Sequence, residues 1–111
     1  MNKNKKKFIC QWTLEIVYGK QKEAIEILKE WGKEKFKSSN FKVSECRIMN
    51  GYAGASPSFI VDEYSFESLD DFEKALDDMS QPQFRKYSDA LAPFVVPGSQ
   101  KWIVYRMIDG D

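Results

Sequence analysis

The stretch 59–79 constrains the fold most, because its periodicity changes from strand to helix within a few residues. It opens with β-branched and aromatic residues, which favour a strand. Ser68 then stands where a helix N-cap belongs, with Asp71 three residues on as an acidic form of the capping box. Apolar residues follow at helical spacing: Leu69, Phe72, Leu76 and Met79. A strand that leads directly into an amphipathic helix is half of a βαβ-type unit.

The remaining segments carry their own patterns. Residues 8–18 alternate, and one face of this predicted strand is wholly apolar or aromatic and should lie under helices: Phe8, Cys10, Trp12, Leu14, Ile16 and Tyr18. The further predicted elements are a helix over 21–36, an edge strand over 41–49, a loop over 50–57, a short second helix after the first within 80–91, and a last strand over 101–108.

The predicted helix at 21–36 has an apolar stripe, and Lys and Glu residues cover its outer side. The stripe consists of Ala24, Ile27, Leu28, Trp31 and Phe36.

The order β-α-β-β-α-β predicts an α+β, ferredoxin-like fold. We expect one domain over residues 8–108 after a disordered basic tail at 1–7, with a four-stranded antiparallel sheet in the order 4-1-3-2 and helices on one face. The other face would carry Ile9, Val17 and several aromatic residues, which is too much apolar surface to leave in water. A second copy packing sheet against sheet would cover it, so a homodimer is predicted.

Composition narrows the classes of function. The chain has 17 basic and 17 acidic residues, so no net field favours nucleic acid or an anionic membrane, and no apolar run is long enough to span a bilayer. It has no histidine, which removes Ser-His and Cys-His nucleophile pairs, His-ligated haem and most zinc sites. Two cysteines without CxxC spacing suit a reduced, cytoplasmic protein. No cofactor or metal is predicted.

With these elements in order, the sequence resembles the dimeric α/β-barrel superfamily, which includes NIPSNAP-like, antibiotic-biosynthesis-monooxygenase-like and EthD-like proteins. The features that carry the resemblance are the Gly19 turn before the helix with Trp31, the Gly51 loop, the joint 63–69 and the late helix that ends at Pro93. The resemblance covers residues 8–108 and is one of pattern. It implies a homodimer with a small-molecule pocket, and relatives that include cofactor-free monooxygenases, isomerases and haem-degrading enzymes. The haem-handling members use a histidine, which this chain lacks.

Glu15 and Glu63 are the predicted catalytic pair. They lie within neighbouring strands, and if both point away from the helices, repulsion and burial would raise at least one pKa, as a general acid or base near neutral pH requires. The alternative is that one reaches solvent or pairs with Arg47 or Arg106. Asp62 takes the opposite face, and a register error of one residue would exchange it with Glu63.

Aromatic side chains could line a pocket for an aromatic ligand. The predicted substrate-binding residues are Tyr64, Tyr105, Trp102 and Arg47. Trp12 and Trp31 are interpreted as core residues at the interface between strand and helix.

Two functions remain open at this point. The first is a small enzyme acting on an aromatic or carbonyl-containing molecule, either a cofactor-independent monooxygenase or an isomerase, with Glu15 or Glu63 as the base and Tyr105 or Tyr64 orienting the substrate. The second is a non-catalytic homodimeric module for ligand binding or assembly.

Overall fold

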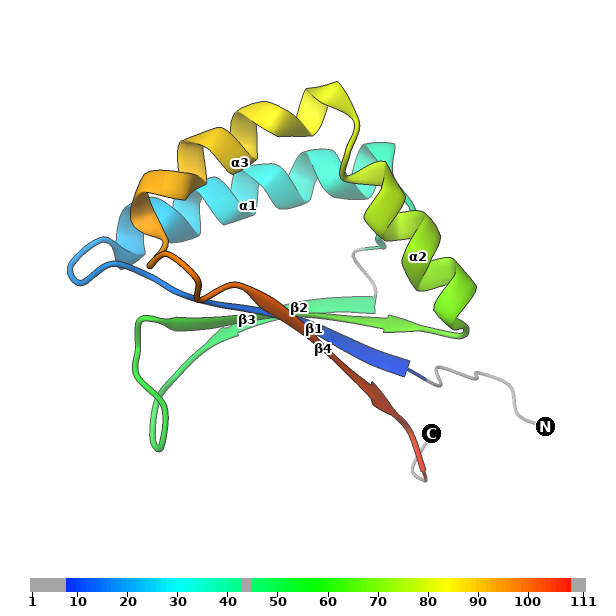
Figure 1. Ribbon diagram of the computed structural model, residues 1–111, viewed down its shortest axis with the longest axis horizontal. Coiled ribbons are helices and arrows are strands. Elements are labelled where there is room, and N and C mark those ends of the chain that lie inside the picture. Colours follow the sequence, from blue (N-terminus) through cyan, green and yellow to red (C-terminus); the bar gives the residue numbers. More distant parts are fainter. Residues whose placement is uncertain (1–7, 43–44, 109–111) are drawn as a thin grey trace.

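The computed structural model describes residues 8–42 and 45–108 of the chain. A four-stranded antiparallel sheet forms one layer and the helices form the other (Figure 1). The elements are β1 (Phe8–Glu15), α1 (Gln21–Ser38), β2 (Cys46–Asn50), β3 (Phe59–Phe66), α2 (Leu69–Asp78), η2 (Pro82–Phe84), α3 (Arg85–Leu91), η3 (Ala92–Phe94) and β4 (Lys101–Arg106). The predicted tail at 1–7 lies outside the described residues.

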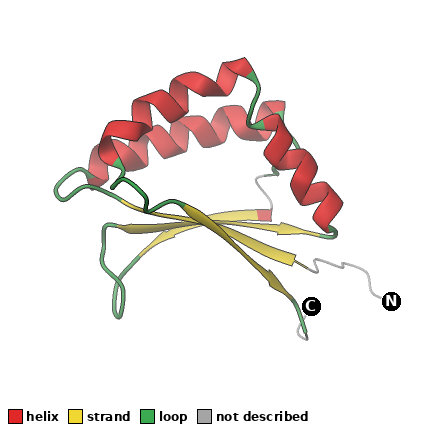
Figure 2. Ribbon diagram, in the orientation of Figure 1, coloured by secondary structure: helices red, strands yellow, loops and turns green. Residues whose placement is uncertain are grey.

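The strands are ordered β2-β3-β1-β4, and all three pairings are antiparallel. This is the predicted order 4-1-3-2, and Figure 2 shows the helices together on one side of the sheet. The ferredoxin-like α+β fold is therefore confirmed. Among the described residues, no helix is both long and apolar enough to cross a membrane.

The joint between β3 and α2 forms as the sequence indicates. Ser68 has extended backbone angles, and its Oγ accepts a hydrogen bond of 3.1 Å from the Asp71 backbone N–H. This cap satisfies one of the free N–H groups of the first turn. Phe72 and Ala75 are the buried residues of α2, whereas Leu69 is exposed because it lies at the first turn.

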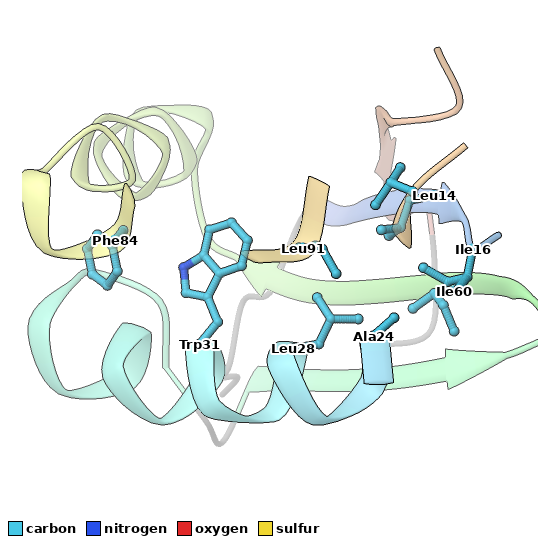
Figure 3. Packing of buried hydrophobic residues seen from close by; sticks show 9 residues of the cluster. Leu14, Ile16, Ala24, Leu28, Trp31, Ile60, Phe84 and Leu91 are labelled. Carbon is cyan, nitrogen blue, oxygen red and sulfur yellow. The ribbon is translucent and has the colours of Figure 1, made fainter. Parts of the chain in front are cut away.

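The hydrophobic core lies between sheet and helices. In Figure 3, Ala24, Leu28 and Trp31 project from α1 into this layer, where they join residues of β1, β3, η2 and α3. The cluster consists of Leu14, Ile16, Ala24, Leu28, Trp31, Ile60, Phe84, Leu91 and Val95. A second cluster, with Cys10, Phe41, Tyr64, Phe66, Phe72 and Ala75, continues it toward α2.

The predicted strand at 8–18 is too long. β1 ends at Glu15, and a tight turn follows in which the Lys20 N–H donates to the Val17 carbonyl and Gly19 has a φ of 81°. Tyr18 is consequently 95% exposed and does not lie under the helices. Periodicity alone misplaced it, because a turn can continue an alternating pattern without any strand pairing.

The predicted edge strand over 41–49 is also wrong at its start. β2 begins at Cys46, and it is indeed at the edge of the sheet. Phe41 is buried in the core, where its ring lies 4.4 Å from that of Tyr64. Residues 43–44 of the predicted strand lie outside the described residues. At Phe41, packing of the aromatic side chain in the core takes the place of the predicted strand pairing.

The loop between β2 and β3 depends on Gly51. A Cβ built on Gly51 would lie 2.1 Å from the Ser56 carbonyl oxygen, so no larger residue fits without moving the backbone. The Gly51 N–H donates to the Phe59 carbonyl across this tight loop, at the start of β3.

Candidate functional site

The most unusual feature of the core is a charged cluster between α1 and the sheet. The Lys35 ammonium donates a 2.7 Å hydrogen bond to the Tyr64 hydroxyl, which in turn donates a 2.7 Å hydrogen bond to Oδ2 of Asp62. Lys35 Nζ is also 3.5 Å from that carboxylate oxygen. Lys35 and Asp62 are each 5% exposed. A buried ion pair is tolerated only when it is well paired and hydrogen-bonded, and this one is.

The helix places Lys35 in the core by simple periodicity. Ala24, Leu28, Trp31 and Lys35 are the buried residues of α1 and follow one another at steps of four, three and four. Phe36, which was predicted to lie on the stripe, is half-buried at the margin of the stripe. The spacing of Lys35 in the sequence indicates that it belongs to the buried stripe, but a charged residue is normally expected on the exposed side of a helix.

Aromatic rings surround the ammonium of Lys35. Its Nζ lies 5.1 Å from the ring centroids of both Trp31 and Tyr64, 5.3 Å from that of Phe41 and 5.9 Å from that of Trp12. Each ring face can attract a cation, but none replaces the water that the ammonium has lost. Burial accordingly lowers the pKa of Lys35, against the opposing effect of Asp62 and Cys46.

Tyr64 and Cys46, which both lie beside Asp62, are held neutral. Burial, with Asp62 beside it, raises the pKa of the Tyr64 hydroxyl, so this phenol keeps its proton. Burial raises the pKa of the Cys46 thiol to about 12, and its Sγ lies 3.6 Å from Oδ1 of Asp62. Cys46 is therefore a weak hydrogen-bond donor to the carboxylate and not a reactive thiolate.

Two cavities border this cluster. The first, which we call the tryptophan cavity, has a volume of about 210 Å³ and is lined by Trp12, Trp31, Lys35, Phe41, Leu76, Met79, Gln100 and Trp102. The second has a volume of about 350 Å³ and is lined by Cys46, Asp62, Tyr64 and residues of α1. The Lys35–Tyr64–Asp62 chain thus reaches from one cavity to the other.

The tryptophan cavity has the walls that a planar ligand requires. Trp12 stacks on Trp102 with ring centroids 6.4 Å apart and meets the edge of Trp31 at 5.7 Å. Trp31 Nε1 is buried and has no hydrogen-bond partner among the described residues. An aromatic cleft with few polar groups is typical of small-molecule sites.

The predicted catalytic glutamates lie on the other side of the sheet, which we call the uncovered face. Glu63 is opposite Gln11 in the β1–β3 register and Glu15 is opposite Phe59, so both point away from the helices. Four positions of β1 separate them, or ~13 Å along a strand. Within one protomer, the structure does not bring these two carboxylates together.

Each glutamate has partners of its own. Glu63 receives hydrogen bonds from Arg47 Nε at 2.6 Å and from Gln11 Nε2 at 2.9 Å, and it is 6% exposed. The alternative in which Glu63 pairs with Arg47 is therefore the arrangement observed. Glu15 accepts a hydrogen bond from the Ser58 hydroxyl. The catalytic roles of Glu15 and Glu63 stay a prediction.

The predicted substrate-binding residues are divided between the two faces. Trp102 and Tyr64 lie on the helix side, where Trp102 lines the tryptophan cavity. Tyr105 and Arg47 lie on the uncovered face, in register with Ile9 and Glu63, and Tyr105 is half-exposed. The sequence did not lead us to predict Lys35 as a site residue, and Asp62 was considered only as an alternative to Glu63. Among the described residues, no group of three or more potential ligands is placed to hold a metal ion.

No family model matches the chain, and no curated protein sequence matches it. Solved structures do. A NIPSNAP family protein from Agrobacterium tumefaciens is similar with a TM-score of 0.79 and 13% identity, over 100% of this chain and 94% of that one. A proposed antibiotic biosynthesis monooxygenase from Nitrosomonas europaea has a TM-score of 0.69 and 11% identity, over 97% and 96% of the two chains.

A third structure is SnoaB, a cofactor-independent oxygenase from Streptomyces nogalater, solved as a mutant. It is similar with a TM-score of 0.67 and 13% identity, over 94% of this chain and 96% of that one. Identities this low establish the fold alone. The chain therefore has the ferredoxin-like fold that NIPSNAP proteins share with antibiotic-biosynthesis-monooxygenase-like proteins.

Proposed function

We propose that this protein binds a small aromatic or carbonyl-containing molecule in the tryptophan cavity and acts on it as a cofactor-independent monooxygenase or an isomerase. One observation carries the proposal: the cavity wall combines three indole rings with the buried amine of Lys35. The rings offer area for a planar ligand, and the amine offers a polar group for its oxygen.

A cofactor-independent oxygenation and a proton-shift isomerisation can both begin with removal of a proton from the ligand. A side chain can do this near neutral pH when its environment has moved its pKa toward the working range. Burial lowers the pKa of Lys35 in that direction. The fold shared with a cofactor-independent oxygenase is consistent with such chemistry but does not carry it, because one fold supports many functions.

Indole resonances offer a direct test. The chain has three tryptophans, and all three line the cavity, so a ¹H–¹⁵N spectrum reports on the site through its indole N–H signals. Titration with phenol or benzaldehyde should shift these signals, whereas the Met49 backbone amide on the uncovered face should stay in place. Indole signals that do not move at millimolar ligand would contradict the proposal.

Oxygen consumption separates the two reaction classes. An electrode measurement with a ligand that shifts the indole signals should show uptake for a monooxygenase and none for an isomerase, which would instead give a product of unchanged mass. Binding without either change would favour the non-catalytic alternative, a homodimeric ligand-binding or assembly module. The paired state of Glu63 on the uncovered face is compatible with that alternative.

We also propose that a second copy covers the uncovered face. The apolar side chains on it include Ile9, Phe59, Val61 and Ile103, which are half-buried, and Met49 and Tyr105, which are exposed. A patch of this kind on a sheet face is typical of an interface. Light scattering at micromolar concentration should give the mass of a dimer. Ile103→Glu should shift it to that of a monomer, and a monomeric wild type would contradict the proposal.

A further inference from the structure

The surroundings of the Lys35 amine differ from those of the other lysines that form ion pairs in the described residues. Lys33, two residues along the same helix, has a side chain that is 74% exposed and pairs with Glu30 at the surface. The Lys35 side chain is 6% exposed, lines the tryptophan cavity, and has one aromatic hydroxyl and one carboxylate within 3.5 Å. An amine in dry, aromatic surroundings is a nucleophile when it is neutral.

We propose that Lys35 forms an imine with an aldehyde or ketone bound in the tryptophan cavity. This inference rests on the proposed function and narrows its ligand class to carbonyl compounds. The imine nitrogen would hold the ligand at the end of the Lys35 side chain, against the rings that line the tryptophan cavity. Tyr64 and Asp62 stand beside this nitrogen as a proton donor and acceptor.

The covalent step balances without any further reactant. The lone pair of the neutral amine attacks the carbonyl carbon, and a C–N bond forms while the carbonyl oxygen takes a proton to give a carbinolamine. The C–O bond then breaks and the oxygen leaves as water, with both hydrogens originating from the amine. No oxidation or reduction occurs.

Tyr64 is the group placed to move these protons. Its hydroxyl accepts from Lys35 Nζ and donates to Asp62, so it can pass a proton from nitrogen to oxygen while Asp62 holds the charge. Its raised pKa keeps the phenol protonated for this task, and the lowered pKa of Lys35 increases the neutral fraction of the amine. Cys46, the remaining titratable group at Asp62, is a neutral thiol with a pKa of about 12.

Reductive trapping tests the inference. The protein is incubated with benzaldehyde and cyanoborohydride near neutral pH, and benzylation of each lysine is followed over time by peptide mass spectrometry. Lys35 should be modified faster than Lys33, by up to about tenfold for each unit that separates their pKa values. Equal or slower modification of Lys35 would overturn the inference, because an amine without activation or access would react no faster than a surface one.

Two variants sharpen the test. Lys35→Arg keeps a cation beside Asp62 and should abolish the adduct at position 35, assigned by fragmentation of the peptide, while Lys33 reacts as before. Tyr64→Phe keeps the ring and removes the hydroxyl, and it should slow trapping at Lys35 by about tenfold or more, as expected for loss of a proton-transfer group. Unchanged trapping in Tyr64→Phe would overturn the role of Tyr64.

The indole titration distinguishes failure of this inference from failure of the proposed function. If benzaldehyde shifts the tryptophan signals but leaves Lys35 unmodified, the cavity binds the ligand without an imine, and only the present inference fails. If benzaldehyde and phenol both leave those signals in place, the proposed function fails with it.

Discussion

Asp62 and Glu63 are neighbours in β3, and each forms an ion pair, yet the two pairs lie on opposite faces of one sheet. Asp62 meets Lys35 in the core, where both side chains are less than a tenth exposed. Glu63 meets Arg47 on the uncovered face, where the arginine side chain is 71% exposed. Because strand side chains alternate, one step along the chain changes the partner of a buried carboxylate from a buried lysine to an exposed arginine.

The difference shows which pair is suited to chemistry. An arginine stays protonated at any physiological pH and holds Glu63 by charge and hydrogen bonding. A buried lysine can lose its proton, so the Lys35–Tyr64–Asp62 chain can exist in more than one protonation state.

Removal of each cation should affect stability unequally. Lys35→Met leaves the Asp62 carboxylate buried without its cation, which should lower the free energy of unfolding by about 3 kcal/mol. Arg47→Met removes an exposed cation and leaves the buried Glu63 carboxylate with the Gln11 amide, so it should lower the free energy of unfolding by less, about 1–2 kcal/mol. Denaturant unfolding monitored by tryptophan fluorescence measures both. Equal losses would mean that burial does not distinguish the pairs.

Salt should separate the pairs in double-mutant cycles. The cycles combine Lys35→Met with Asp62→Asn and Arg47→Met with Glu63→Gln, and they measure the coupling free energy of each pair. Raising NaCl from 0.1 to 1 M shortens the screening length from about 10 Å to about 3 Å, so the coupling of Arg47 with Glu63 should fall from its value of up to about 1 kcal/mol. The coupling of Lys35 with Asp62 should barely change, since no ions reach it. A coupling of Lys35 with Asp62 that falls to the same extent would show that ions reach the cluster.

The effect of pH on stability should also differ. Burial lowers the pKa of Lys35 from 10.5, so between the lowered value and 10.5 the unfolded chain binds a proton that the folded chain does not. The stability that Lys35 contributes therefore rises with pH across this window. The difference in unfolding free energy between wild type and Lys35→Met should grow by up to about 1.4 kcal/mol per pH unit and level off above pH 10.5.

Arg47→Met is the control for this measurement, because its guanidinium does not titrate in the same range. The Cys10 thiol, whose pKa burial raises to about 11, is present in all three proteins and cancels from the differences. A flat difference between wild type and Lys35→Met would show that Lys35 keeps its proton in the folded state as readily as in the unfolded one.

Glu63→Gln should have the smallest effect on folding, at most about 1 kcal/mol, because the amide has the same shape, its oxygen still accepts from Arg47, and the Gln11 amide can turn to accept from its NH2 group. If Glu63 is the catalytic base of a dimeric barrel, with the substrate on the uncovered face, turnover should fall by about 10²–10⁴ in this variant. Turnover equal to that of wild type would end the predicted catalytic role of Glu63.

Much of the fold could be predicted from local patterns. The cap at Ser68, the helical spacing after it and the alternation in 8–15 each depend on neighbours in sequence, and each forms as expected. The strand order follows from the order of elements, because antiparallel split βαβ units have few allowed arrangements. The segments that failed, at Tyr18 and Phe41, are those where a turn or a distant ring decided the outcome.

The candidate site required the tertiary structure. The sequence by itself determined that Asp62 and Glu63 occupy opposite faces, since side chains alternate along any strand. It did not determine which face meets α1, nor that Lys35, 27 positions before Asp62, would approach it to 3.5 Å. Helical periodicity placed Lys35 on the buried stripe, but its charge argued for solvent, and only the pairing with Asp62 and Tyr64 in the assembled core makes its burial tolerable.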